Sequence, residues 1–206
     1  MTGIPGIAVK TGIKGRGLWL RFFVLFLATG ISLISSCGKE YSEENGAGSA
    51  SQGTLTLSFQ HTVKNFILNF DDQYTTDFGE TYRVSSFKYY LHNITLVSGP
   101  ETAALLSPDY FLVDEAAPAS KTLSFKAPAA NYTALRFTLG VDSADNVSGA
   151  QAGALDPVNG MFWTWTTGYV MAKLEGTSPF VTGSATNEFS YHVGGFKEPY
   201  SAIKTI

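Results

Sequence analysis

The sequence is poor in cysteine, histidine and charge. Its 206 residues include one cysteine, three histidines and 15% charged side chains. Because Cys37 stands alone, one chain cannot form an internal disulfide, a thiolate zinc site or a redox pair of cysteines. The motifs GxxxxGK(S/T), GxSxG and HExxH are absent, and no GxGxxG lies between a strand and a helix. We therefore predict a protein that is not an enzyme.

Basic residues are also scarce outside the N-terminal segment. Residues 1–36 carry four basic side chains and no acidic one, whereas the rest of the chain carries ten basic and 17 acidic side chains. An acidic surface of this kind repels the phosphate backbone of nucleic acids. We expect no nucleic-acid partner.

The apolar run at residues 22–34 (FFVLFLATGISLI) is too short to cross a bilayer as a permanent helix, which needs about 20 residues. Basic residues precede it, and small residues followed by Cys37 end it, as in the lipobox of bacterial lipoproteins. We predict a lipoprotein signal peptide over residues 1–36 and a lipid on Cys37. The lipid would hold the protein to a membrane of the bacterial cell envelope, facing the periplasm or the cell surface. An ordinary signal peptide or a signal anchor is the alternative.

Residues 37–53 contain mostly Gly, Ser, Glu and Asn, so we predict a flexible tether there. From Thr54 onward apolar side chains recur with a period of two, which is typical of strands. Aromatic side chains make up 14% of the sequence, and 21 glycines supply turns. We predict one all-β domain over residues 54–206, an antiparallel β-sandwich of Greek-key type. Its expected strands include residues 54–60, 66–70, 82–97, 110–114, 121–126, 132–141, 161–175 and 188–193, and residues 82–97 form either one bent strand or two strands with a break near residues 85–86.

Three histidines are the strongest candidates for metal chemistry, because a neutral imidazole binds copper or zinc. His61 continues the alternation of Leu57 and Phe59 and should face the apolar side of its strand. His192 falls on the opposite face from Tyr191 if its strand is regular. His92 lies within an apolar strand, where a structural role is expected. A hydrogen-bonded histidine at the rim of the core is the alternative for His61.

The densest pattern is the segment at residues 155–169. Its Asp-Pro and Asn-Gly dipeptides predict a tight turn, after which Met161, Trp163 and Trp165 share one face of a strand. Tryptophans two residues apart pack into a core, line a pocket, stack on a sugar or serve as redox-active side chains.

The stretch at residues 142–160 is the longest expected loop and offers oxygen atoms to a hard cation. We name Asp142, Asp145, Asn146 and Asp156 as candidate calcium ligands, although their spacing matches no twelve-residue calcium loop. Capped turns in a solvated loop are the alternative.

The run LDPVNGMFWTWTTGYVMAKLEG at residues 155–176 resembles the MbnP-like family. The stretches YYLHNI, FLVD, LRFTLGVD and HVGGF extend the resemblance over about residues 54–196. The family consists of secreted or lipid-anchored β-sandwich proteins, and its namesake is a periplasmic copper-binding protein associated with the chelating peptide methanobactin. Relatives usually continue through further strands, so the resemblance implies either a fragment or a short member.

The resemblance implies a copper-binding envelope protein with His61 and His192 as candidate ligands. It also implies oxidation of a tryptophan, with Trp163 or Trp165 as candidates, by a di-haem partner of the cytochrome c peroxidase class. The competing hypothesis is a non-catalytic envelope module that has lost the metal site and binds a glycan or a protein. The copper hypothesis expects the two histidines to converge.

Overall fold

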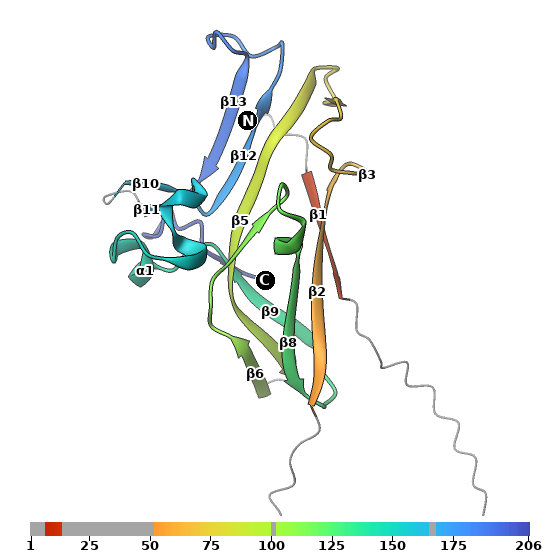
Figure 1. The fold of residues 1–206 in the computed structure, drawn as a ribbon, viewed down its shortest axis with the longest axis vertical. Helices are drawn as coiled ribbons and strands as arrows, with labels where there is room; N and C mark the ends of the chain where they lie inside the picture. Colours follow the sequence, from red (N-terminus) through yellow and green to blue (C-terminus); the bar gives the residue numbers. More distant parts are fainter. Residues whose placement is uncertain (1–6, 14–51, 100–101, 165–167) are drawn as a thin grey trace, which may run out of the picture.

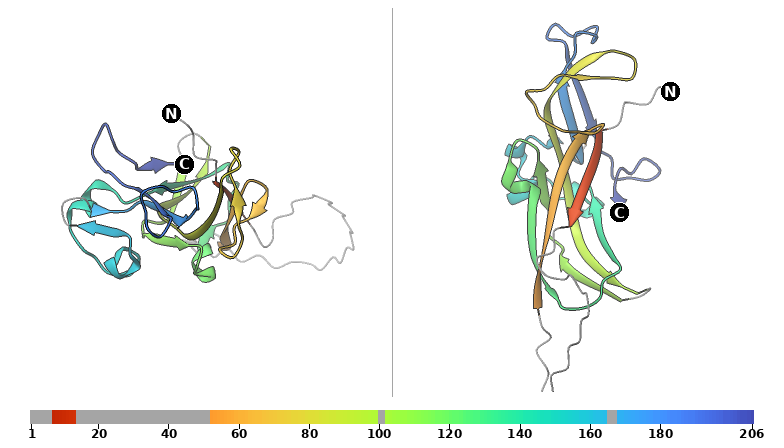
Figure 2. Two further views of the ribbon diagram at one scale, coloured as in Figure 1. Left: turned by 90° about the horizontal axis from the view of Figure 1, so that it is seen from above. Right: turned by 90° about the vertical axis from the view of Figure 1, so that its right-hand side faces the viewer.

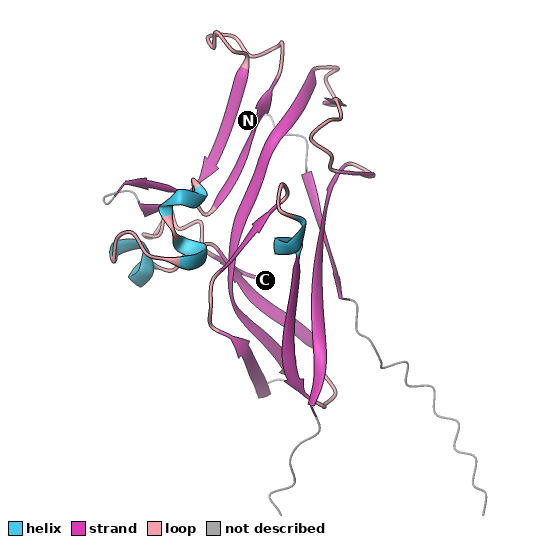
Figure 3. Ribbon diagram, viewed as in Figure 1, coloured by secondary structure: helices cyan, strands magenta, loops and turns pink. Residues whose placement is uncertain are grey.

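The computed structural model describes residues 7–13, 52–99, 102–164 and 168–206. Strands dominate this part of the chain, and every strand pairing in it is antiparallel. The helices are short (Figure 3). They are α1 (Ser143–Val147) and the 3-10 helices η1 (Pro118–Lys121), η2 (Gly153–Leu155) and η3 (Pro157–Asn159). The prediction of an all-β sandwich is confirmed.

The first layer is a small sheet built on β2 (Gln52–Val63). Along one edge β2 pairs with β8 (Thr122–Pro128) and β3 (Phe66–Ile67), and along the other edge with β1 (Ile7–Ile13). Strand β1 lies within the segment predicted to be a signal peptide, so this pairing belongs to the uncleaved chain. Figure 2 shows β1 and β2 as one layer beside β5.

The second layer is a larger sheet centred on β5 (Thr81–Ser98), which runs the length of the domain (Figure 1). One edge of β5 pairs with β12 and β9, and the other with β4, β7 and β6. Strands β13 and β14 extend the sheet. The strands around β5 are β4 (Tyr74–Thr75), β6 (Thr102–Ser107), β7 (Phe111–Asp114), β9 (Ala134–Leu139), β12 (Ala172–Thr177), β13 (Glu188–Val193) and β14 (Lys204–Thr205).

β5 is one continuous strand with two irregularities. The first is a register shift where Glu175 and Gly176 of β12 pair with Ser86 and Val84, which leaves one extra residue on β5. The second lies at Asn93, whose φ of 53° is left-handed. Of the two sequence interpretations, the single bent strand is therefore confirmed, and the expected break is a bulge.

The main core lies between the two layers. Leu57 and Phe59 of β2 pack against Tyr89 and Leu91 of β5, together with Phe137 of β9. These side chains are all buried, as the period of two predicts. Burial of such rings and branched chains supplies most of the free energy of folding.

Residues 142–164 and 168–170 form a third layer on the outer face of β5. Met161 and Tyr169 are completely buried against Tyr90 in a second apolar cluster. The short strands β10 (Phe162–Thr164) and β11 (Gly168–Tyr169) pair beside this cluster. The expected loop at residues 142–160 is thus a packed cover, and it ends at the turn where Gly160 adopts a φ of 70°. Within the described residues no helix is long and apolar enough to span a membrane.

Candidate functional site

His61 lies between the two layers, on the inner face of β2. Its exposed fraction is 1%, and both ring nitrogens have partners. Nδ1 donates to Oε2 of Glu115, and Nε2 lies 2.9 Å from the hydroxyl of Tyr89 on β5. The ring also meets Phe87 edge-on, with 4.8 Å between the centroids.

Glu115 and Lys121 complete this network. The second carboxylate oxygen of Glu115 accepts a hydrogen bond of 2.6 Å from Nζ of Lys121. Burial lowers the pKa of His61 by more than the hydrogen bond with Glu115 raises it, so the ring is neutral at pH 7. Because Glu115 accepts at Nδ1, the lone pair of the neutral ring is on Nε2.

Tyr89 donates its hydroxyl proton to that lone pair. Burial raises the pKa of Tyr89, and the charge of Glu115 raises it further, so the phenol stays protonated. A neutral imidazole whose Nδ1 is held by a carboxylate is the arrangement found at metal-binding histidines. Here the position of a metal ion at Nε2 is taken by the Tyr89 hydroxyl.

His192 lies on the opposite, outer face of the β12–β13 pair. On β12 the residue opposite His192 is Lys173. The next residue of β13, Val193, lies opposite Ala172, and Ala172 in turn lies opposite Tyr89 of β5. Val193, Ala172 and Tyr89 line the inner face, so His192 projects away from His61. The structure therefore does not bring the two predicted copper ligands together.

The partners of His192 form a separate, half-buried cluster. Nε2 lies 2.7 Å from Oε1 of Glu175 and 2.8 Å from Oγ of Ser190. A serine–histidine–acid relay needs its serine and its acid on different ring nitrogens, and both partners meet Nε2 here. Burial alone would raise the pKa of Glu175, but the hydrogen bond with His192 and the charge of Lys173 outweigh it and lower that pKa.

Trp163 donates its indole N–H to Nδ1 of His192 over 3.4 Å. Its exposed fraction is 40%, whereas Met161 is fully buried, so the two side chains do not share one core face. Gly194 makes room for the ring, because a Cβ there would lie 2.5 Å from Cζ3 of Trp163. Trp165 and the predicted lipidation site Cys37 lie outside the described residues.

His92 has the structural role expected for it. It is buried, and its Nδ1 bonds the carbonyl oxygen of Gly140 over 3.1 Å. Burial lowers its pKa, against the raising effect of that carbonyl and of Asp142 and Asp145.

The four calcium candidates each hold part of the third layer in place. Asp142 caps α1 by accepting from the backbone N–H of Asp145, and Asp145 accepts from the hydroxyl of Tyr110. Asn146 is buried and bonds the backbone of Val141 and Tyr169. Asp156 caps η3. Across the described ranges, no three or more His, Cys, Asp or Glu side chains gather as metal ligands would.

The sequence interpretation missed Glu115, Tyr89 and Glu175. Tyr89 could be found from the alternation, since it shares a face with Phe87 and Leu91. Glu115 follows β7 directly, and only the pairing of β7 with β5 brings it to His61. No local pattern carries that pairing.

The model of the family named MbnP matches residues 52–206. The chain belongs to the MbnP family. Among solved structures, MbnP from Methylosinus trichosporium is similar, with a TM-score of 0.56 and 16% sequence identity. The match covers 70% of this chain and 63% of that chain, so this chain spans less than two thirds of that relative, and the likeness shows a shared fold. The search of curated proteins finds no match.

Proposed function

We propose that this member of the MbnP family is a cell-envelope protein, held to a membrane by a lipid on Cys37, that binds copper in metal acquisition or delivery. The observation that carries the proposal is the orientation of His61. Glu115 holds Nδ1, so the lone pair of Nε2 is directed into the space between the layers. Envelope location is supported by the apolar run and Cys37 that precede the domain.

The chemistry of this donor favours a soft or borderline ion. Imidazole nitrogen suits copper, and a carboxylate on the other ring nitrogen raises its basicity as a ligand. A protonated phenol is a poor ligand, so copper must replace the Tyr89 hydroxyl at Nε2. Phe87 and Tyr89 would then surround the ion with rings that exclude water.

The number of donors favours transfer over storage. Within the described residues His61 has no second histidine beside it, because His192 lies on the other face of the sheet and His92 bonds Gly140. We infer that His61 supplies one nitrogen and that the other donors arrive with the copper, as part of the complex received or passed on. Oxidation of Trp163 or Trp165 by a di-haem partner stays a prediction.

The test is a titration of the purified full-length protein with Cu(I) against a competing chelator. We expect one copper per chain and at least a tenfold loss of affinity in His61→Gln. The matched control is His192→Ala, which removes an imidazole from the outer face and should leave the affinity unchanged. An unchanged affinity in His61→Gln, or a loss in His192→Ala alone, would overturn the assignment.

A second variant keeps the test independent of folding defects. Tyr89→Phe removes the hydroxyl that competes for Nε2 and leaves the ring in place, so copper should bind more tightly than in the wild-type protein. Weaker binding in this variant would make Tyr89 a ligand instead. If the wild-type protein takes up no copper, the envelope binding module for a glycan or a protein becomes the better hypothesis.

A further inference from the structure

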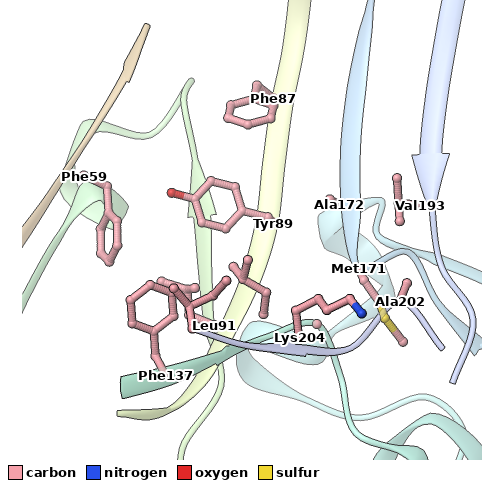
Figure 4. A pocket seen from close by; sticks show the side chains of 13 residues that line it. Phe59, Phe87, Tyr89, Leu91, Phe137, Met171, Ala172, Val193, Ala202 and Lys204 are labelled. Carbon is pink, nitrogen blue, oxygen red and sulfur yellow. The ribbon is translucent and has the colours of Figure 1, made fainter. Parts of the chain in front are cut away.

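A cavity of about 440 Å³ lies between the layers, beside the core and independent of the His192 cluster. It runs from Phe59 on β2 across the inner face of the large sheet to β14, where Lys204 and Ile206 are exposed to solvent. Figure 4 shows the rings of Phe87, Tyr89 and Phe137 along one side of it and Met171 and Ala172 on the other. The volume is in the range of small-molecule sites.

The lining is apolar apart from two side-chain groups, the hydroxyl of Tyr89 and the ammonium of Lys204. The hydroxyl is already bonded to His61. Lys204 lies at the open side, and no carboxylate among the described residues pairs with it. The cavity therefore presents one unpaired positive charge at the end of a hydrophobic channel.

A peptide segment fits this lining poorly. Every residue of a peptide carries a backbone donor and an acceptor, and burying them without partners is costly. Of the strands that line the cavity, β5, β9 and β12 are paired along both edges, and the side chains offer only the two polar atoms named above. The occupant should have no polar group along its length.

We propose that this cavity binds a long-chain carboxylate of the fatty-acid class. The alkyl chain lies among Phe59, Phe87 and Phe137, where each methylene removed from water adds hydrophobic free energy. The carboxylate remains at the open side and pairs with Lys204. This binding does not use the lone pair of His61 and does not depend on copper.

The experiment measures displacement of a fluorescent polyene fatty acid from the purified full-length protein. Palmitate should displace the probe at micromolar concentration, and hexadecanol, which has the same chain without the charge, at least fivefold more weakly. Lys204→Gln should remove this preference by weakening palmitate alone. Equal affinity for the acid and the alcohol in the wild-type protein, or no displacement by either, would overturn the proposal.

Two filling variants test the place of binding. Ala172→Trp and Ala202→Trp each add a ring to the lining of the cavity, and each should weaken palmitate at least tenfold. The matched control is Ala185→Trp in the exposed turn between β12 and β13, which should have no effect. Circular dichroism shows which of the variants fold. One filling variant that folds is sufficient for the test. Unchanged palmitate binding in the folded variant would overturn the proposal. If the wild-type protein is a dimer and the filling variant is a monomer, a second copy of the chain occupies the cavity, and the proposal is overturned as well.

Discussion

His61 and His192 lie on opposite faces of the sheet formed by β5, β12 and β13. His61 packs against Tyr89 on the inner face, and His192 stands beside Lys173 on the outer face. One ion cannot contact both imidazoles, because the sheet separates them. The two histidines expected to form one site thus lie in two different environments. His61 is buried and held by Glu115, whereas His192 is half-buried and held by Glu175.

The ion pair network at Glu115 should contribute measurably to stability. Glu115→Gln leaves Lys121 without its carboxylate and weakens the hydrogen bond to His61, whose side chain is fully buried. We expect the free energy of unfolding in urea to fall by about 2 kcal/mol. A change no larger than that of an exposed ion pair would contradict this role.

An exposed ion pair of the same chain is the control. Lys64 and Asp77 lie 2.7 Å apart with side chains that are 47% and 73% exposed. Because solvent screens such pairs, Asp77→Asn should change the free energy of unfolding by less than about 0.5 kcal/mol.

Replacing Tyr90 by phenylalanine should stabilise the protein. Its hydroxyl is buried and has no hydrogen-bond partner among the described residues, so its desolvation is not offset. Tyr90→Phe should raise the free energy of unfolding by about 1 kcal/mol. Tyr169 is the opposite case, since its hydroxyl donates to the carbonyl of Leu155 over 2.8 Å and accepts from the N–H of Gln151. Tyr169→Phe should lower the stability, and the same sign in both variants would refute the argument.

The fold followed from the sequence because its pattern is local. Alternation at Leu57 and Phe59 places these residues in the core whatever the partner strand is. The short strands β4 and β14 were not expected, because two residues cannot show a period. The packing of residues 142–164 and 168–170 was also missed, since Leu155 and Met161 are buried by a contact with β5 that their own neighbours do not reveal.

The candidate site could be predicted from the sequence only in part, again because only local patterns can be read from it. The inward direction of His61 follows from the alternation along β2, and the outward direction of His192 follows from the alternation along β13. Their partners Glu115 and Glu175 are 54 and 17 residues away in the sequence, and strand pairing brings them close. Local pattern can therefore point a side chain to a face, but it cannot say which carboxylate meets it there.

His92 makes stability depend on pH. Burial lowers its pKa in the folded state below that of the unfolded chain, despite the opposing effects of Asp142 and Asp145. The unfolded state then binds more protons below the ordinary pKa of 6.5, so the free energy of unfolding falls as the pH drops from about 7 to about 5. Tyr110 packs on the ring and stays neutral throughout this range, because burial raises its pKa. Urea titrations of the wild-type protein and His92→Gln should show a shallower slope in the variant, and parallel slopes would exclude His92 as a source.

Gly194 determines where the Trp163 indole can lie. A Cβ at this position would stand 2.5 Å from the ring and 3.1 Å from the carbonyl oxygen of Tyr169, so Gly194→Ala must displace the indole from its present position beside His192. We expect a loss of about 1 to 3 kcal/mol, the usual cost of overpacking. In a Trp163→Ala background the same change should cost less, because the ring that it meets is gone. A double-mutant cycle in urea measures this coupling, and additive effects would mean that the two residues do not touch.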